Sequence, residues 1–96
     1  MEFLIKRTDG DWFDLNKRQF ADVLRPSSFQ SCPIAGWGDH RIEIRDCEIA
    51  FSFEIAGLQV IFQDNTLTEA EALQVTNEIA ESITKAIGQK SKVIQL

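Results

Sequence analysis

The chain has 96 residues, with 15 acidic against 10 basic side chains and a formal net charge of −5. This charge disfavours proteins whose affinity comes from neutralising phosphates. The basic residues lie in small scattered groups without the interleaved aromatic side chains that single-strand binders use. We therefore expect no nucleic-acid binding, and the acidity favours either simple solubility or attraction to a basic protein partner.

The length predicts one domain, residues 1–96, that buries roughly 60–70 % of its unfolded surface. The first residues hold only three consecutive apolar side chains before two charges, and no later run is long enough to cross a bilayer. We therefore expect a chain without a signal peptide or a membrane contact, located in the cytoplasm. In that compartment Cys32 and Cys47 are expected to remain thiols.

The first third of the chain predicts a hairpin and then a short helix. Residues 3–7 have the pattern of a strand, Asp9-Gly10 favours a turn, and residues 12–15 are the expected partner strand. Asn16 and Gln19 have the spacing of a capping box, which predicts a short helix directly after them. Pro26 predicts the end of that helix.

Three strands are expected between Arg41 and Gln63. Apolar residues occupy alternate positions from Cys47 to Ile55, which indicates one buried face. A first turn at residues 45–46 pairs Glu43 with Glu48 on the outward face. A second turn is expected at residues 56–57, which would pair Ile55 with Leu58, Phe53 with Val60 and Phe51 with Phe62.

A long amphipathic helix follows the three strands. Thr68 and Glu71 form a capping-box pattern, and Gly88 stands where a left-handed C-terminal cap is expected, so the helix should cover about residues 69–87. Its apolar side chains fall in one sector, and its polar face carries glutamates rather than the lysines of a membrane-surface helix. We expect this helix to pack on the core.

The segment from Pro26 to His40 has neither helical nor strand periodicity, and connections of this length are usually functional or disordered. Phe29, Ile34 and Trp37 argue against disorder. They either pin the loop to the core or, in the case of Trp37, supply an anchor for a protein interface.

The outward sheet face beside this loop is the second candidate contact surface. A facing pair of glutamates costs stability unless a cation relieves it, and Arg41 and Arg45 are both placed to do so. The pair is then either an ordinary solvated face or an acidic patch for a partner's cation. The candidate partner-binding residues are Trp37, Asp39, His40, Arg41, Glu43 and Glu48.

Catalytic and metal chemistry receive little support. Cys32 precedes a proline in a loop, and the adjacent side chains of Asp39 and His40 tend to diverge, which is a poor arrangement for a Cys–His nucleophilic site. A zinc site that includes Cys47 lacks a paired-cysteine knuckle, and no phosphate-binding glycine loop occurs. We therefore expect no catalytic residue, no metal and no cofactor.

Together these patterns predict an α+β fold in the order β-β-α-β-β-β-α-β, with the long helix across one face of a mainly antiparallel sheet and residues 93–96 as a last strand or docked tail. The favoured function is a small interaction protein, namely an inhibitor, an immunity-type protein or a regulatory binder, that uses residues 26–41 and the outward sheet face. The alternatives are an assembly subunit that oligomerises through Ile61 and the terminal strand, and a Cys/His enzyme.

Overall fold

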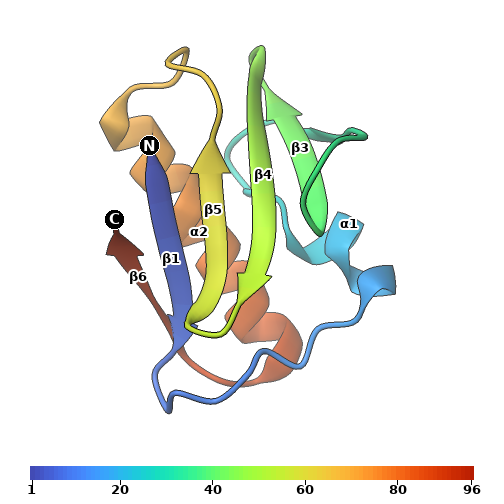
Figure 1. Cartoon of the computed structure of the whole chain (residues 1–96), viewed down its shortest axis with the longest axis vertical. Helices are drawn as coiled ribbons and strands as arrows, with labels where there is room; N and C mark the ends of the chain where they lie inside the picture. Colours follow the sequence, from blue (N-terminus) through green and yellow to red (C-terminus); the bar gives the residue numbers. More distant parts are fainter.

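The computed structural model describes all residues, 1–96, and has two layers: a six-stranded antiparallel sheet and a long helix across one of its faces (Figure 1). The α+β class, the antiparallel sheet and the pair of one long and one short helix are confirmed. The strands lie in the order β2-β3-β4-β5-β1-β6. In chain order the elements are β1 (Glu2–Arg7), the 3-10 turn η1 (Lys17–Gln19), α1 (Phe20–Val23), β2 (Cys32–Pro33), β3 (His40–Ile44), β4 (Cys47–Glu54), β5 (Gly57–Phe62), α2 (Glu69–Ile87) and β6 (Ser91–Gln95).

Helix α2 begins and ends where its sequence signals predicted. The Thr68 hydroxyl accepts a hydrogen bond from the Glu71 N–H, and the Glu71 carboxylate accepts one from the Thr68 N–H. Gly88 ends the helix at φ 71°, in the left-handed region that glycine adopts without steric cost. The helix face turned to the sheet buries Ala72, Val75, Thr76, Ile79, Ala80 and Ile83.

The hairpin between β3 and β4 has the expected register, with Glu43 opposite Glu48. Its turn residues Arg45 and Asp46 have φ of 47° and 64°. Positive φ at both central positions matches the right-handed twist of the flanking strands, although asparagine and glycine are the usual residues there. The hydrophobic alternation therefore determined the register at a turn whose residues do not favour it.

The turn between β4 and β5 lies one residue earlier than expected, and the register of the two strands is therefore shifted by two residues. The turn residues are Ile55 and Ala56, and Phe53 pairs with Leu58 rather than with Val60. A shift of two leaves every side chain on its expected face, so alternation alone does not distinguish the two registers. The surroundings of Gly57 distinguish them. A Cβ at this residue would lie 2.4 Å from the carbonyl oxygen of Ile5, so glycine is required here by the close approach of β1 rather than by the turn.

The strand expected at residues 12–15 does not form. This segment belongs to no strand, and β1 instead lies between β5 and β6. The Arg7 side chain connects β1 to this segment in the absence of strand pairing. Its Nη1 donates to the carbonyl oxygen of Trp12 at 2.7 Å, and its Nη2 lies 2.6 Å from Asp9 Oδ2. The hydrogen bond between the two side chains raises the pKa of Arg7 and lowers the pKa of Asp9.

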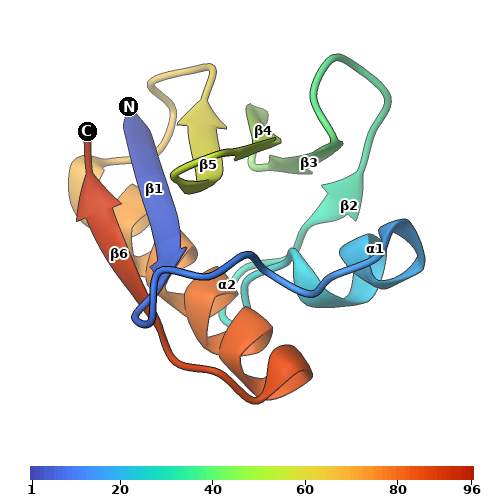
Figure 2. The same cartoon turned by 60° about the horizontal axis from the view of Figure 1, so that its bottom comes forward.

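The short helix follows its predicted cap. Asn16 and Gln19 form the capping box in front of η1 and α1, and Phe20, Val23 and Leu24 enter the core. The core lies between the sheet and the two helices. Figure 2 shows that the other face of the sheet carries no helix and that the loop between β2 and β3 rises on that side.

Candidate functional site

The loop between β2 and β3 is tied to the sheet at both ends. The Ile34 N–H donates to the carbonyl oxygen of Arg41 at 3.0 Å, and the Asp39 N–H donates to that of Phe51 at 2.8 Å. The Asp39 carboxylate also accepts the Phe53 N–H, at 2.7 Å. These bonds continue the ladder beyond the strand ends, so the loop has a defined position over the outward face (Figure 2).

Two glycines allow the loop to lie close to the sheet. A Cβ at Gly38, where φ is 100°, would lie 2.9 Å from the carbonyl oxygen of Phe51. A Cβ at Gly36, where φ is 154°, would lie 2.5 Å from Cδ of Arg41. Trp37 stands between them and remains 54 % exposed, whereas Phe29, the first apolar residue of the segment, packs against the core. Phe29 therefore anchors the segment that precedes β2, whereas Trp37, on the loop between β2 and β3, is not packed on the core.

Arg41 connects Trp37 to the sheet. Its guanidinium carbon lies 5.4 Å from the centroid of the Trp37 ring, and its Nε lies 2.9 Å from Oε1 of Glu48. Arg41 itself is only 8 % exposed, and its Nη1 is buried without a hydrogen-bond partner. A cation over an aromatic face attracts it by about 0.5–2 kcal/mol, so the arrangement restrains the indole while leaving its outer side in water.

The two arginines do not act together as expected. Arg41 bonds to Glu48, but Nη2 of Arg45 lies 2.6 Å from Oε2 of Glu71 on α2. The Thr68 N–H and this arginine lower the pKa of Glu71. Glu43 has no hydrogen-bond or ion-pair partner in the chain. Only one guanidinium therefore relieves the facing glutamates.

Further carboxylates lie at the same end of the sheet. Oδ2 of Asp64 accepts the backbone N–H of Glu48 at 3.2 Å, and Asp46 is exposed in the adjoining turn. Four carboxylates, those of Glu43, Asp46, Glu48 and Asp64, thus share this end of the sheet with two guanidinium groups, of which Arg41 pairs with Glu48 and Arg45 pairs with a further carboxylate, that of Glu71. The local charge is negative, which favours approach by a basic group.

His40 is separated from the other candidates. Its ring faces the core, with centroids 5.9 Å from both Phe20 and Phe51, and its Nε2 is buried without a partner. Burial lowers the pKa of His40. Of the six sequence candidates, Trp37, Arg41, Glu43 and Glu48 therefore share one surface, which we call the Trp37 surface, while Asp39 holds the loop and His40 packs inside.

The cysteines do not form a reactive site with His40. Cys32 is exposed and pairs with Glu43, which places its side chain on the outward side of the sheet, opposite to the face of His40. Cys47 is buried, and both thiols are free. No group of three or more His, Cys, Asp or Glu side chains is arranged to hold a metal ion.

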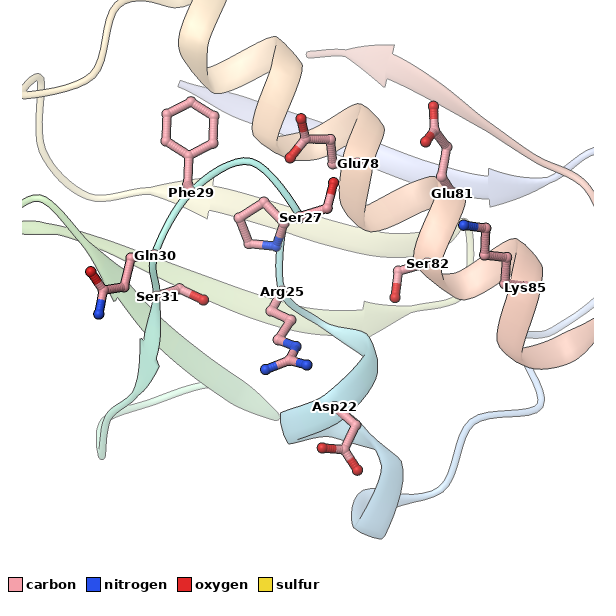
Figure 3. Close-up of a pocket in the computed structure, with 11 residues that line it drawn as sticks. Asp22, Arg25, Ser27, Phe29, Gln30, Ser31, Glu78, Glu81, Ser82 and Lys85 are labelled. Atoms are coloured by element: carbon pink, nitrogen blue, oxygen red, sulfur yellow. The ribbon is translucent and has the colours of Figure 1, made fainter.

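A wide polar hollow of about 580 Å³ separates the 25–31 segment from α2. Figure 3 shows Glu78 of α2 beside Ser27, with Glu81 and Lys85 farther along the helix. Oε1 of Glu78 accepts the Ser28 N–H at 2.8 Å, so this side chain ties the segment to the helix. The lining mixes both charges with a single apolar side chain, and it includes none of the candidates from the sequence.

Sequence reasoning missed two exposed apolar groups. Trp12, expected in a strand, is 59 % exposed, and Ile55, expected inside the sheet, is 91 % exposed in the turn. The irregular face pattern of residues 12–15 was the available signal for Trp12. For Ile55 the sequence offered no such signal, because glycine also suits the expected turn and the crowding of Gly57 by β1 exists only in the folded chain.

No helix of the chain has the length and apolar character needed to cross a bilayer. Comparison with protein-family models, with curated proteins and with solved structures finds no match to this chain.

Proposed function

We propose that the chain is a protein-binding module and that the Trp37 surface is its contact with a basic protein partner. The observation that carries the proposal is the exposure of Trp37 on a loop that hydrogen bonds hold in place. Tryptophan is among the residues that most often dominate binding energy, and a side chain that is already ordered loses little entropy on binding.

The charges around Trp37 support a basic partner. Glu43 has no partner within the chain, and the Glu48 side chain remains 43 % exposed although it pairs with Arg41. A guanidinium or ammonium group from another protein would relieve the facing glutamates and gain a charge-assisted hydrogen bond. An inhibitor, an immunity-type protein or a regulatory binder would all use such a surface.

The test compares two tryptophans of similar exposure at different places on the molecule. The wild-type chain, immobilised, is used to isolate a partner from a lysate of the source organism, and the purified pair is then measured by calorimetry. We expect Trp37→Ala to weaken the complex about 30-fold, the equivalent of ~2 kcal/mol, and Trp12→Ala to leave the affinity unchanged.

A charge-reversal pair completes the design. Glu43→Lys should weaken the complex further, whereas Glu54→Lys, the same change at the other end of the outward face, should have little effect. Thermal unfolding of each variant checks that the fold is retained. Equal affinities for the two tryptophan variants, together with equal affinities for the two lysine variants, would rule out the Trp37 surface as the contact.

A further inference from the structure

The two edges of the sheet differ in how well they can accept another strand. At one edge β2 has only two residues, and one of them is Pro33, which has no N–H to donate. At the other edge β6 has five residues, no proline and a single charge, Lys92. Short strands and prolines protect an edge from pairing, so β2 is blocked and β6 is open.

The ladder to β1 determines which backbone groups of β6 are free. Leu96 donates its N–H to Glu2, and Lys90 accepts the N–H of Thr8, so the even-numbered residues are the ones bonded to β1. In an antiparallel ladder the intervening residues point their N–H and C=O groups to the other side. Ser91, Val93 and Gln95 therefore present three donors and three acceptors along the open edge.

Apolar side chains flank this edge on both faces of the sheet. Ile94 and Leu96 alternate with the inward residues Val93 and Gln95, which places them on the outward face, where they are 38 % and 62 % exposed. On the other face Leu73 of α2 is 39 % exposed, one turn beyond Glu69, whose carboxylate accepts a hydrogen bond from Gln95. A hollow of about 590 Å³ also opens between α2 and β6. Three of the six exposed large hydrophobic side chains thus border one strand.

We infer that β6 is a dimerisation strand that pairs antiparallel with β6 of a second copy of this chain, extending the sheet across a two-fold axis at Val93. In this register Val93 faces Val93 of the second copy, and Ser91 faces Gln95. The free backbone N–H and C=O groups of Ser91, Val93 and Gln95 in each strand then pair with those of the other strand, which gives six hydrogen bonds. The interface is isologous, because the same strand serves both copies.

The charges favour this register of the two β6 strands, and they favour a second copy of the chain as the partner. A register centred one residue earlier would set Lys92 against Lys92, whereas the proposed register sets Lys92 beside Ile94 of the second copy. The two-fold axis also makes the two α2 helices antiparallel. The acidic N-terminal turn of one helix, with Glu69 and Glu71, then lies toward the end of the other that carries Lys85.

This interface lies at the opposite edge of the sheet from β3 and the Trp37 surface (Figure 1), so it is independent of the function proposed above. A dimer formed through β6 would leave both Trp37 surfaces open and would be bivalent toward a partner. Bivalent binding raises the apparent affinity without any new contact when the partner is itself repeated.

Sedimentation equilibrium over about 1 μM to 1 mM chain tests the dimer. We expect a monomer–dimer equilibrium in the wild type and, for Val93→Pro, a dissociation constant at least about 30-fold higher, since that change removes two hydrogen bonds across the axis. Val93→Ala is the matched control, because it trims the same side chain but keeps the N–H. Leu73→Lys should likewise weaken the dimer, whereas Gln74→Lys, on the helix side that faces Glu78, should not.

Amide hydrogen exchange of the wild type decides the matter if a variant fails to fold. The amides of Lys92, Ile94 and Leu96 should be protected at every concentration, and those of Ser91, Val93 and Gln95 only where the dimer forms. A chain that stays monomeric up to 1 mM overturns the inference. So does a dimer whose odd-numbered β6 amides exchange as fast as in the monomer.

Discussion

Arg41 and Glu48 form an ion pair across β3 and β4, with Nε 2.9 Å from Oε1, directly beside the exposed ring of Trp37. This one guanidinium relieves a facing pair of glutamates and also restrains the tryptophan. Arg41 thus contributes both to the stability of the sheet and to the shape of the Trp37 surface. The two properties are therefore linked.

Removing that guanidinium should cost more than removing its neighbour. Arg41→Met keeps the buried stem but leaves Glu43 and Glu48 opposed, so we expect a loss of about 1–2 kcal/mol in the free energy of unfolding, measured by urea denaturation. Arg45→Met breaks only the exposed pair with Glu71 and should cost clearly less than Arg41→Met. Adding Glu48→Gln to Arg41→Met should restore part of the loss, and no recovery would mean that the facing charges are not its cause.

The approach of β5 to β1 should make Gly57 intolerant of any side chain. We expect Gly57→Ala to lower the free energy of unfolding by at least about 2 kcal/mol, because its φ of 146° disfavours L residues and the new Cβ would meet the Ile5 carbonyl oxygen at 2.4 Å. Gly88→Ala is the control: φ is 71° there, but no heavy atom lies within 4 Å of the new Cβ. It should cost about 1 kcal/mol. Equal losses would argue against the steric account of the β4–β5 register.

His40 should make the stability depend on pH in the neutral range. Burial lowers its pKa below the ordinary value of 6.5, so the unfolded chain binds the proton more readily than the folded one. The contribution of the neutral ring is fully present above pH 6.5 and is lost as the pH falls toward the lowered folded value. Urea midpoints measured between pH 5 and pH 8 should therefore fall on the acidic side.

A single substitution removes every imidazole from the protein, because His40 is the only histidine of the chain. His40→Phe keeps an aromatic ring against Phe20 and Phe51 but removes the ionisable group. Its urea midpoint should be nearly constant across the same range. A variant that retains the wild-type slope would assign the pH dependence to another group.

Local signals in the sequence predicted those elements whose ends and faces depend on near neighbours in the chain. Helix α2 has its expected bounds because the Thr68–Glu71 box and Gly88 act within one turn of each end. The β3–β4 register and the facing of Glu43 and Glu48 followed from alternation over a two-residue turn. The loop that carries Trp37 was expected next to this pair because it directly precedes β3 in the sequence, whereas the contact of Trp37 with Arg41 was not predicted.

The tertiary structure alone decided what depends on contacts between distant segments. The β4–β5 register shifted by two residues because Gly57 accommodates β1, which is remote in sequence and exerts no effect on local alternation. The strand expected at 12–15 was lost because β6 took its place beside β1. Arg45 pairs with Glu71 of α2, and His40 packs against Phe20 of α1, because these partners come from other elements of the fold. Periodicity in a sequence fixes which face a residue occupies, and only the folded chain fixes what lies opposite that face.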